Sequence, residues 1–537
     1  MTKRMARRML LVFFVFCVLI GLISVQLLFV PVDHPVQRSL GTVSIAIAES
    51  RGAIYDRNGK RLVHQTAQTA AVVKPTDAAL ESLRGVLAAD KLNSAKERAQ
   101  KGALFSIPID TDQIQCGDIL LLNTYPRYAS KQLAVHLIGY LESPAGKGVS
   151  GLEKSFDQLL TEAGGTLRVR AQADSAGRVF AGSALTVEDE DYCGAAGIML
   201  TIDAKMQELV EEAMLDSNLT QGAVVVLDVK TGEIMSMASL PAFDPNNVAS
   251  SLHDPLEPFI NRALLAYPVG STFKCFVIAA ALEQNVPTTQ CYTCNGALDV
   301  NGRLFHCNNK NGHGTLDMSG ALEQSCNLYF VQLMQRLELQ PALDFFALFG
   351  FGEPNTLAPD LRGAKGNLPG LADLFQPAAR ANLSFGQGAL LATPLQLAAA
   401  TAALASGGIY HTPTLVKSVL NAGGSETEYV QDTETRQVIS EKTADIVAEM
   451  MIRTVEQGTG YSAKPAYGSA GGKTATAQSG SYDSSGNEIL QTGFTGFFPA
   501  RNPRYVITVL RQNGVSGSQD CGPVFQKIAD MLLARGF

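Results

Sequence analysis

The alternation of apolar and polar positions divides the chain into three stretches. Residues 9–30 form an apolar run without a single charge, and a helix of that length would measure about 33 Å. Residues 35–195 mix short alternating segments, such as TVSIAIA and TLRVRAQ, with charged and glycine-rich connections, which indicates a β-rich region. From Ile198 onward the apolar pattern is denser, and it predicts a large mixed α and β domain.

Several elements of this large domain can be predicted from the pattern. The segment GAVVVLDVKTGEIMSMAS, from Gly222, reads as two strands around a turn, and LTIDAKMQELVEEAML reads as an amphipathic helix capped by Asp203. Apolar helices are expected in TFKCFVIAAALEQN and in PLQLAAATAALAS, from Pro394. Two more strands, FTGFFPA and RYVITVLRQ, precede a closing helix. Strands at both ends with helices between them predict a sheet whose strand order differs from the sequence order.

The N-terminal apolar run predicts a membrane anchor. Lys3, Arg4, Arg7 and Arg8 precede it, and no basic residue follows it directly, so the N-terminus is expected inside the cell. The alternative is a cleaved signal peptide, but the run ends in SVQLLFVPV and offers no small-residue cleavage site. We therefore expect a cytoplasmic tail at 1–8, a signal-anchor at 9–30 and an extracytoplasmic remainder.

Composition and charge exclude several classes of function. Hydrophobic residues make up 46% of the 537 positions and charged residues 17%, which excludes a disordered chain. The formal net charge of −7 gives no general attraction to nucleic acid. Nine cysteines in a chain of this length are too few for a disulfide scaffold.

The strongest chemical signal is the sequence Ser271-Thr272-Phe273-Lys274, which follows Gly270 and opens an apolar helix. Residues three apart on a helix share a face, so Lys274 can remove the proton from the Ser271 hydroxyl if burial lowers the pKa of the amine. The motif alone is weak, because a helix cap with a nearby lysine is common.

Two further motifs follow in order, Ser325-Cys326-Asn327 and Lys473-Thr474-Ala475-Thr476. Ser-x-x-Lys, Ser-x-Asn and Lys-Thr-Gly in this order form the set found in β-lactamases and penicillin-binding proteins. With the surrounding segments, the chain resembles a class B penicillin-binding protein, a monofunctional peptidoglycan D,D-transpeptidase of the division or sporulation type. The segments that carry this resemblance are RGAIYDRNGKRL, SGLEKSFDQLL, LTIDAKMQ, NRALLAYPVGSTFK, LSFGQGALLATPLQLAAA and TGFTGFFPA.

The resemblance implies a fold and a division of labour. The fold would be α+β: the membrane anchor, a β-rich pedestal at 31–195, and a transpeptidase domain at 196–537 with a five-stranded antiparallel sheet flanked by helices, like that of serine β-lactamases. Residues 35–195 carry no glycosyltransferase motif. A SEDS-type membrane glycosyltransferase is therefore the expected partner, beside peptidoglycan stem peptides and β-lactam antibiotics. No metal ion or organic cofactor is expected.

The resemblance also implies roles for the motif residues. Ser271 would attack the carbonyl between two terminal D-alanines, Lys274 would accept its proton, and Ser325 would relay a proton to the leaving amine. The substrate-binding residues would be Asn327 for an amide and the Lys473-Thr474-x-Thr476 segment for a terminal carboxylate. The backbone N–H groups of Ser271 and Thr476 would form an oxyanion hole.

One position departs from the family pattern. Ala475 stands where the family usually has glycine, and its methyl group could crowd the strand that receives substrate. This leaves open a catalytically weak or inactive penicillin-binding scaffold for the glycosyltransferase. A D,D-carboxypeptidase, which transfers the acyl group to water, is the other alternative.

The cysteines between the first two motifs invite two interpretations. The segment CNGALDVNGRLFHC predicts a hairpin that turns at Asn301-Gly302, with Cys294 and Cys307 near each other at its base. Related sporulation enzymes carry a similarly placed redox-sensitive pair, so Cys294–Cys307 is a candidate disulfide, with two buried thiols as the alternative. A zinc site built from Cys291, Cys294, His306 and Cys307 is disfavoured, because adjacent residues on a strand point to opposite faces.

Overall fold

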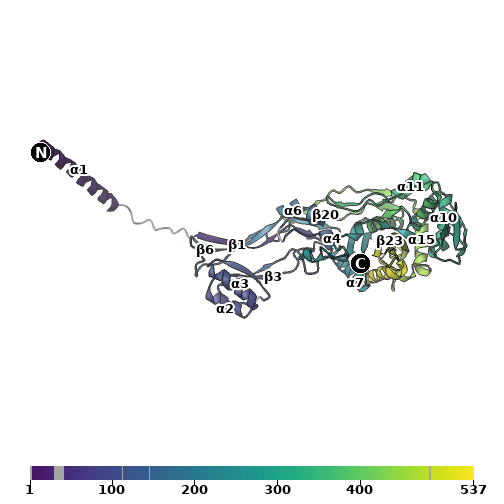
Figure 1. Ribbon diagram of the computed structural model, residues 1–537, viewed down its shortest axis with the longest axis horizontal. Helices are drawn as coiled ribbons and strands as arrows, with labels where there is room; N and C mark the ends of the chain where they lie inside the picture. Colours follow the sequence, from purple (N-terminus) through teal and green to yellow (C-terminus); the bar gives the residue numbers. More distant parts are fainter. Residues whose placement is uncertain (1–2, 29–40, 112, 144–145, 483–484) are drawn as a thin grey trace. The chain divides into compact units, whose positions relative to one another are not determined.

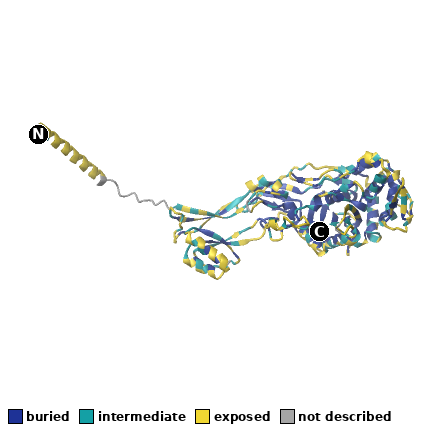
Figure 2. Ribbon diagram, in the orientation of Figure 1, coloured by how far each residue is buried: buried dark blue, intermediate teal, exposed yellow. Residues whose placement is uncertain are grey.

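The computed structural model describes residues 3–28, 41–111, 113–143, 146–482 and 485–537 (Figure 1). The N-terminal helix α1 spans Lys3–Leu28 and is exposed along almost all of its length (Figure 2). Within the described residues, its segment Arg4–Gln26 is the one helix long and apolar enough to cross a membrane. Residues 29 and 30 of the expected anchor, residues 1–2 of the expected tail and residues 31–40 of the expected pedestal lie outside the described residues.

Spatial contacts divide the chain into two compact units, each assembled from separate stretches of sequence. The first contains the described residues up to Ile47 together with 69–123 and 168–188, and the second contains 48–68, 124–167 and 189–537. The boundary expected near residue 195, between pedestal and transpeptidase domain, stays a prediction. The second compact unit contains two earlier stretches, 48–68 and 124–167, in addition to the residues after 189.

The first unit is rich in strands. A sheet of order β4-β3-β5 carries α2 and α3 on one face, because Ala71 and Val73 of β3 pack against Leu83 and Leu92 of the two helices. A second sheet has the order β1-β6-β7. The elements are β1 (Gly41–Ser50), β3 (Gln68–Val73), α2 (Asp77–Arg84), α3 (Ala89–Gln100), β4 (Phe105–Ile109), β5 (Ile119–Thr124), β6 (Gly165–Ala173) and β7 (Thr186–Glu190).

The second unit is built on a five-stranded antiparallel sheet, as expected. Its order is β10-β9-β25-β24-β23, so the last three strands of the chain continue an early hairpin. This confirms that the strand order differs from the sequence order. The strands are β9 (Gly222–Asp228), β10 (Ile234–Leu240), β23 (Gly471–Tyr482), β24 (Glu488–Phe498) and β25 (Tyr505–Gln512).

Both faces of this sheet are buried, which explains why β9 reads as a continuous apolar run. Val224 and Val226 face the cluster formed with α7 and α17, whereas Val225 and Leu227 face the larger cluster on the opposite side. Asp203 caps α7 by accepting hydrogen bonds from the N–H groups of Lys205 and Met206, as predicted. The helices named here are α7 (Ala204–Asp216) and α17 (Gly522–Ala534).

The larger cluster contains the helices between β10 and β23, including the two that begin at Lys274 and Asn327 of the first two motifs (Figure 1). They are α8 (Lys274–Glu283), α9 (Met318–Glu323), α10 (Asn327–Arg336), α11 (Leu339–Leu348), α12 (Leu371–Leu374), α13 (Pro377–Leu383), α14 (Pro394–Ala405) and α15 (Glu441–Gln457). The helix α15 packs directly against the edge strand β23. The remaining short helices are α4 (Val135–Ile138), α5 (Gly151–Ser155), α6 (Asp157–Glu162) and α16 (Gly517–Asp520).

A further sheet in the second unit has the order β2-β8-β20-β21 and joins distant parts of the chain. The remaining strands form two-stranded pairs. The bounds of these strands are β2 (Ala53–Tyr55), β8 (Gly197–Leu200), β20 (Val416–Leu420), β21 (Glu426–Glu428), β11 (Tyr267–Pro268), β18 (Leu391–Ala392), β12 (Tyr292–Cys294), β15 (Gly314–Leu316), β13 (Ala297–Val300), β14 (Arg303–His306), β16 (Thr356–Ala358), β17 (Leu361–Arg362), β19 (Ile409–His411) and β22 (Thr435–Gln437).

The hairpin predicted around Asn301-Gly302 is confirmed. Strands β13 and β14 pair Val300 with Arg303, and both turn residues have positive φ, 50° and 85°, as a two-residue type I′ turn requires. Cys294 precedes this hairpin in β12, and Cys307 follows it directly.

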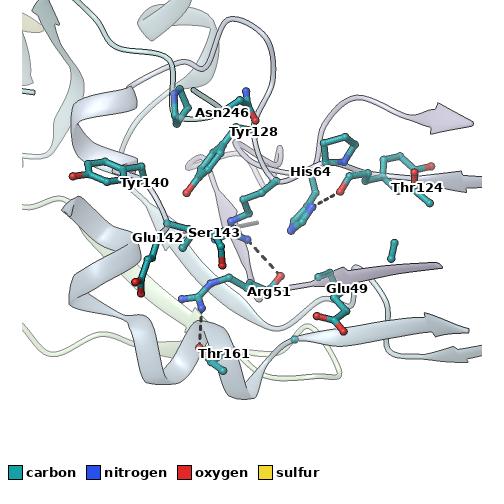
Figure 3. A pocket seen from close by; sticks show the side chains of 18 of the residues that line it. Glu49, Arg51, His64, Thr124, Tyr128, Tyr140, Glu142, Ser143, Thr161 and Asn246 are labelled. Carbon is teal, nitrogen blue, oxygen red and sulfur yellow. Dashed lines mark hydrogen bonds between the residues drawn. The ribbon is translucent and has the colours of Figure 1, made fainter. Parts of the chain in front are cut away.

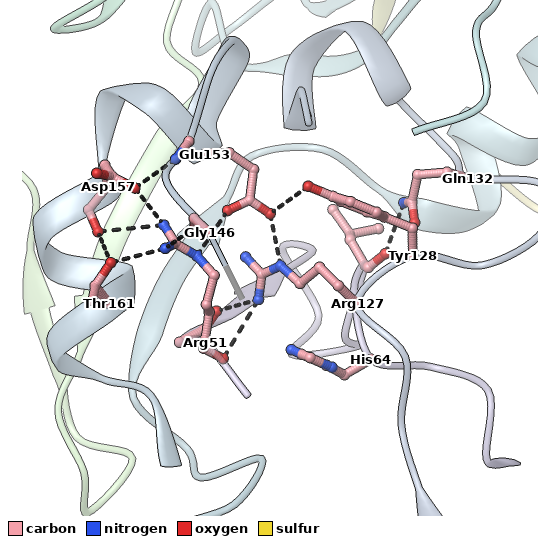
Figure 4. A network of polar contacts seen from close by, with 12 residues as sticks. Arg51, His64, Arg127, Tyr128, Gln132, Gly146, Glu153, Asp157 and Thr161 are labelled. Carbon is pink, nitrogen blue, oxygen red and sulfur yellow. Dashed lines mark hydrogen bonds and ion pairs between the residues drawn. The ribbon is translucent and has the colours of Figure 1, made fainter. Parts of the chain in front are cut away.

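A buried ionic network stabilises the second unit (Figure 4). The carboxylate of Glu153, which is fully buried, lies between two arginines: Arg127 Nε is 2.7 Å from one oxygen and Arg51 Nε is 3.4 Å from the other. Arg51 also pairs with Asp157 at 2.8 Å, and the Tyr128 hydroxyl donates to Glu153 at 3.2 Å. Two cations and two anions balance, which is the condition under which buried charges are tolerated.

A hollow opens beside this network (Figure 3). Arg51, His64, Tyr140 and Asn246 are among the side chains that line it, and none of its lining residues belongs to the three sequence motifs. Burial lowers the pKa of His64 to about 4, so this imidazole is neutral at physiological pH.

Candidate active site

The segment that carries Ser271 is held against the edge strand of the sheet. Gly270–Phe273 form a short 3₁₀ turn that continues directly into α8. Gly270 has φ of 55°, and a Cβ there would lie 3.3 Å from the Cβ of Ala475 in β23. Its N–H donates to the carbonyl of Gly386 at 2.9 Å. Glycine is required at position 270 both for its backbone conformation and for its close approach to the strand.

Lys274 joins the first two motifs. Its side chain is fully buried, and Nζ donates to Ser325 O at 2.8 Å and Asn327 Oδ1 at 2.7 Å, with Ser325 Oγ at 3.2 Å. Burial holds the pKa of Lys274 well below its usual value, and the charge of Lys473 lowers it further. A neutral amine with both N–H groups donated keeps a lone pair, so it can act as a base toward a hydroxyl.

The second motif occupies the sharp connection between α9 and α10. Ser325 has φ of 53°, a left-handed conformation that is uncommon for serine, and the backbone N–H of Cys326 donates to Ala321 O at 2.9 Å. This turn directs the backbone carbonyl of Ser325 and the side chain of Asn327 toward the same amine. Strained residues held in this way often belong to active sites.

The third motif lies on β23. Lys473 is fully buried, and its Nζ contacts Thr474 Oγ1 and Thr459 Oγ1, both at 3.3 Å. Burial lowers the pKa of Lys473 to about 8, so this lysine stays mostly protonated at neutral pH, whereas burial and the charge of Lys473 shift Lys274 toward its neutral form. Two buried lysines, both with lowered pKa values, therefore lie in one region of the site.

Ala475 is accommodated without a clash. It pairs with Gly493 of β24, and Cβ atoms added at Gly270 and Gly493 would lie 3.3 and 3.8 Å from its methyl carbon. The methyl group is buried, whereas the next residue, Thr476, is exposed and accepts a hydrogen bond on Oγ1 from the N–H of Gly517 at 3.2 Å. Two glycines thus provide the room that the alanine needs.

Sequence reasoning missed two contributors to this region. Thr459, which follows α15, lies within hydrogen-bond distance of both Lys473 and Thr474, and Gly386 supports Gly270 through its carbonyl. Thr459 stands in no motif, and only its position after a long helix could have suggested it. Gly386 lies in LSFGQG, a segment recognised by resemblance but without an assigned role.

The cysteines of the predicted pair are free thiols in the structure, and both are buried. The alternative zinc set of Cys291, Cys294, His306 and Cys307 does not assemble. Cys291 and His306 are exposed, whereas Cys294 and Cys307 are buried. Cys294 and Cys307 are instead close to His313 and Cys326.

Three features occur together: an apolar helix that begins with a buried lysine, a five-stranded antiparallel sheet, and a second lysine on the edge strand of that sheet. They define the class of penicillin-recognising serine acyltransferases. A family model described as the penicillin binding protein transpeptidase domain matches residues 222–530, so the chain belongs to this family. It is a serine-type peptidoglycan D,D-transpeptidase of cell-wall synthesis, which acts on peptide substrates and is a target of β-lactams.

Individual relatives extend the similarity over most of the chain. Stage V sporulation protein D of Bacillus subtilis is 28% identical over 518 residues, covering 90% of this chain and 77% of the relative. The peptidoglycan D,D-transpeptidase MrdA of Haemophilus influenzae is 27% identical, covering 98% and 92%. Penicillin binding protein 3 of Mycobacterium tuberculosis, solved with aztreonam, has a TM-score of 0.66 at 25% identity, covering 92% of this chain and 97% of that one. The expected family and fold are confirmed.

Proposed function

We propose that Ser271 is the acylated nucleophile, that Lys274 is its base, and that Ser325 relays the proton. The observation that supports this assignment is the buried amine of Lys274, which contacts both ends of the second motif and lies one turn from Ser271 along the chain. Its lowered pKa favours the neutral form that a general base needs.

The proposed reaction consists of two successive acyl transfers, first to Ser271 and then to an amine. Ser271 Oγ attacks the carbonyl carbon of the penultimate D-alanine, and its proton moves to Lys274 Nζ. The amide bond breaks, and the proton passes through Ser325 Oγ to the nitrogen of the departing D-alanine, which leaves an ester on Ser271. An amine of a neighbouring stem peptide then attacks this ester, forms the new amide and returns a proton to Ser271.

Substrate binding is assigned to polar groups around the nucleophile. Asn327 would hold a peptide amide, and the protonated Lys473 with the hydroxyls of Thr474 and Thr476 would hold the terminal carboxylate. The backbone N–H groups of Ser271 and Thr476 would stabilise the oxyanion. Thr459, which contacts Lys473, would orient the lysine.

The cellular setting is also proposed. The four basic residues in the first turns of α1, before its apolar run, favour an N-terminus in the cytoplasm and a catalytic domain outside the membrane. A SEDS-type membrane glycosyltransferase would supply the glycan strands. The names of the relatives include a sporulation protein and the peptidoglycan D,D-transpeptidases FtsI and MrdA, and we favour a division or sporulation role.

Labelling with a fluorescent penicillin tests the assignment of the nucleophile. The full chain in detergent is expected to gain one adduct by intact mass, and Ser271→Ala is expected to gain none. Ala475→Gly should label at least as fast as the parent chain, because removal of the Ala475 methyl group leaves more room beside the strand proposed to receive substrate. A folded parent chain that stays unlabelled, while Ala475→Gly labels, would mean that the methyl group closes the site. No adduct on either folded protein would support the non-enzymatic scaffold instead.

The acceptor is tested separately. A stem pentapeptide supplied with an amine acceptor should give a cross-linked product, together with free D-alanine. Release of D-alanine without any cross-link would identify the protein as a D,D-carboxypeptidase, in which water replaces the amine.

A further inference from the structure

Four potential metal ligands converge next to the second motif. They come from three separate places in the sequence: Cys294 ends β12, Cys307 and His313 flank the connection between β14 and β15, and Cys326 stands between Ser325 and Asn327. Their sulfur and nitrogen atoms all lie within 4.8 Å of one another. The three cysteines are buried and free, and the histidine is half-buried.

The distances between these atoms match the edges of a zinc tetrahedron. With Zn–S near 2.3 Å and Zn–N near 2.0 Å, tetrahedral angles place two sulfurs about 3.8 Å apart and a sulfur and a nitrogen about 3.5 Å apart. In the structure, Cys307 Sγ is 3.8 Å from Cys326 Sγ. His313 Nδ1 is 3.6 Å from Cys294 Sγ and 3.4 Å from Cys307 Sγ.

The backbone around the cluster is folded closely enough to hold this geometry. The N–H of His313 donates to the carbonyl of Cys294 at 3.0 Å, and the N–H of Cys307 donates to Gly296 O at 2.9 Å. A Cβ on Gly312 would lie 2.3 Å from that same Cys294 carbonyl, so only glycine fits there. The segment 294–313 thus forms a compact loop whose polar sulfurs and imidazole point to one place.

We propose that Cys294, Cys307, Cys326 and His313 Nδ1 bind one structural zinc ion. Three S–H bonds break, three Zn–S bonds and one Zn–N bond form, three protons go to solvent, and the zinc remains divalent. The four protein ligands close the tetrahedron, so the ion has no open position for water and serves structure instead of catalysis.

The location of the fourth ligand gives the ion a role in the active site. Cys326 lies between Ser325 and Asn327, and both of these neighbours contact Lys274 Nζ. Zinc would fix the strained turn at Ser325 by tying its neighbouring residue to the loop 294–313.

Metal analysis of the full chain, purified in detergent from zinc-supplemented cells, tests this proposal. We expect about one zinc per chain. Cys326→Ser and His313→Ala should each weaken zinc binding by about tenfold or more, measured by competition with a chromogenic chelator. Cys291→Ser and His306→Ala are the matched controls, because both side chains are exposed neighbours of the cluster, and they should retain the metal.

Cobalt substitution keeps the proposal falsifiable if a ligand variant fails to fold. The unmodified chain, stripped by a chelator and reloaded with Co²⁺, should show sulfur-to-cobalt charge-transfer bands and the intense visible absorption of tetrahedral thiolate sites. In the zinc-loaded chain, the thiols of Cys294, Cys307 and Cys326 should resist alkylation until the chelator is added.

Two outcomes would overturn the zinc site. One is a metal-free chain in which all three thiols react freely. The other is a chain lighter by two hydrogen atoms, with Cys294 and Cys307 in one non-reduced peptide, which would establish the disulfide instead. The zinc proposal is independent of the role given to Ser271, because metal content is measured without any acylation.

Discussion

The two buried lysines have different environments, and these environments determine how the site responds to pH. Both side chains are fully buried. Burial and the neighbouring charge of Lys473 hold the pKa of Lys274 well below its usual value, and burial lowers the pKa of Lys473 to about 8. Desolvation favours the neutral form of a lysine, and the first of two interacting lysines to lose its proton relieves the repulsion on the other.

The rate of acylation by a penicillin is therefore expected to fall as the pH rises through about 8. Above that value Lys473 loses the charge proposed to bind the carboxylate, while the lowered pKa of Lys274 favours the neutral amine throughout this range. Lys473→Arg should move this fall to higher pH, because guanidinium stays protonated. Stopped-flow acylation rates across the pH range provide the measurement, and an unchanged alkaline limb in Lys473→Arg would contradict the assignment.

Individual residues also mark the limit of prediction from sequence. Ser271, Lys274, Ser325, Asn327 and Lys473 could be named because their spacings are local and their order is characteristic. Thr459, and the approach of His313 to Cys326, could not be named. Such contacts are decided by packing between elements far apart in the chain, which no local periodicity encodes.

At the scale of elements, the segment around Gly386 supports the turn that presents Ser271, the proposed nucleophile. Gly386 has φ of 74°, and a Cβ there would lie only 2.0 Å from the carbonyl oxygen of Gly270. Gly388 has a similar φ of 77°, but its Cβ would meet only the Asn382 side chain, at 3.1 Å. The two glycines share the same backbone requirement and differ in what they touch.

This difference predicts that Gly386→Ala impairs acylation much more than Gly388→Ala does. Both substitutions should cost about 1–2 kcal/mol of stability from the left-handed backbone. Only the first also displaces the residue before Ser271, so its acylation rate should fall by about tenfold or more, consistent with the sensitivity of catalysis to small misplacements. Equal acylation rates in two variants of equal thermal stability would contradict this role of Gly386.

Patterning along the chain predicted some elements well and others only through resemblance. The hairpin at Asn301-Gly302 and the cap at Asp203 follow from local turn and helix chemistry, and both are confirmed. The five-stranded antiparallel sheet was expected from the resemblance, and the pattern predicted only that its strand order differs from the sequence order. Pairing of β9 with β25 joins residues almost three hundred positions apart, and alternation of side chains specifies the faces of a strand but not its neighbour.

At the scale of the whole molecule, the ionic network around Glu153 connects stretches of the second unit that are distant in sequence. Arg51, Arg127 and Glu153 come from three separate segments, and the guanidinium of Arg127 also donates to the carbonyl of Gly52 at 2.7 Å. Since Arg51, Arg127 and Glu153 are all buried, removal of the Glu153 charge leaves the two arginines with too little compensation.

We therefore expect Glu153→Gln to destabilise the protein by about 3–5 kcal/mol, because two buried arginines lose a shared counter-charge while the side-chain shape is kept. Chemical unfolding of the full chain, followed by intrinsic tyrosine fluorescence, measures the change. Glu162→Gln, an exposed position on the nearby helix α6, is the matched control and should be close to neutral. Similar stability of the two variants would show that the network contributes little.

The pairing of β2 with β8 has a consequence for how such proteins can be rearranged in evolution. Ala53–Tyr55 run parallel to Gly197–Met199, and Gly197 approaches Ala53 so closely that a Cβ would lie 1.9 Å from its carbonyl. A single recombination junction near residue 195 would give a chimaera with the two partners drawn from different parents. Because β1 likewise pairs with β6, genetic exchange that preserves the fold should carry residues 41–537 together, and mosaic alleles are expected to have their breakpoints before residue 41.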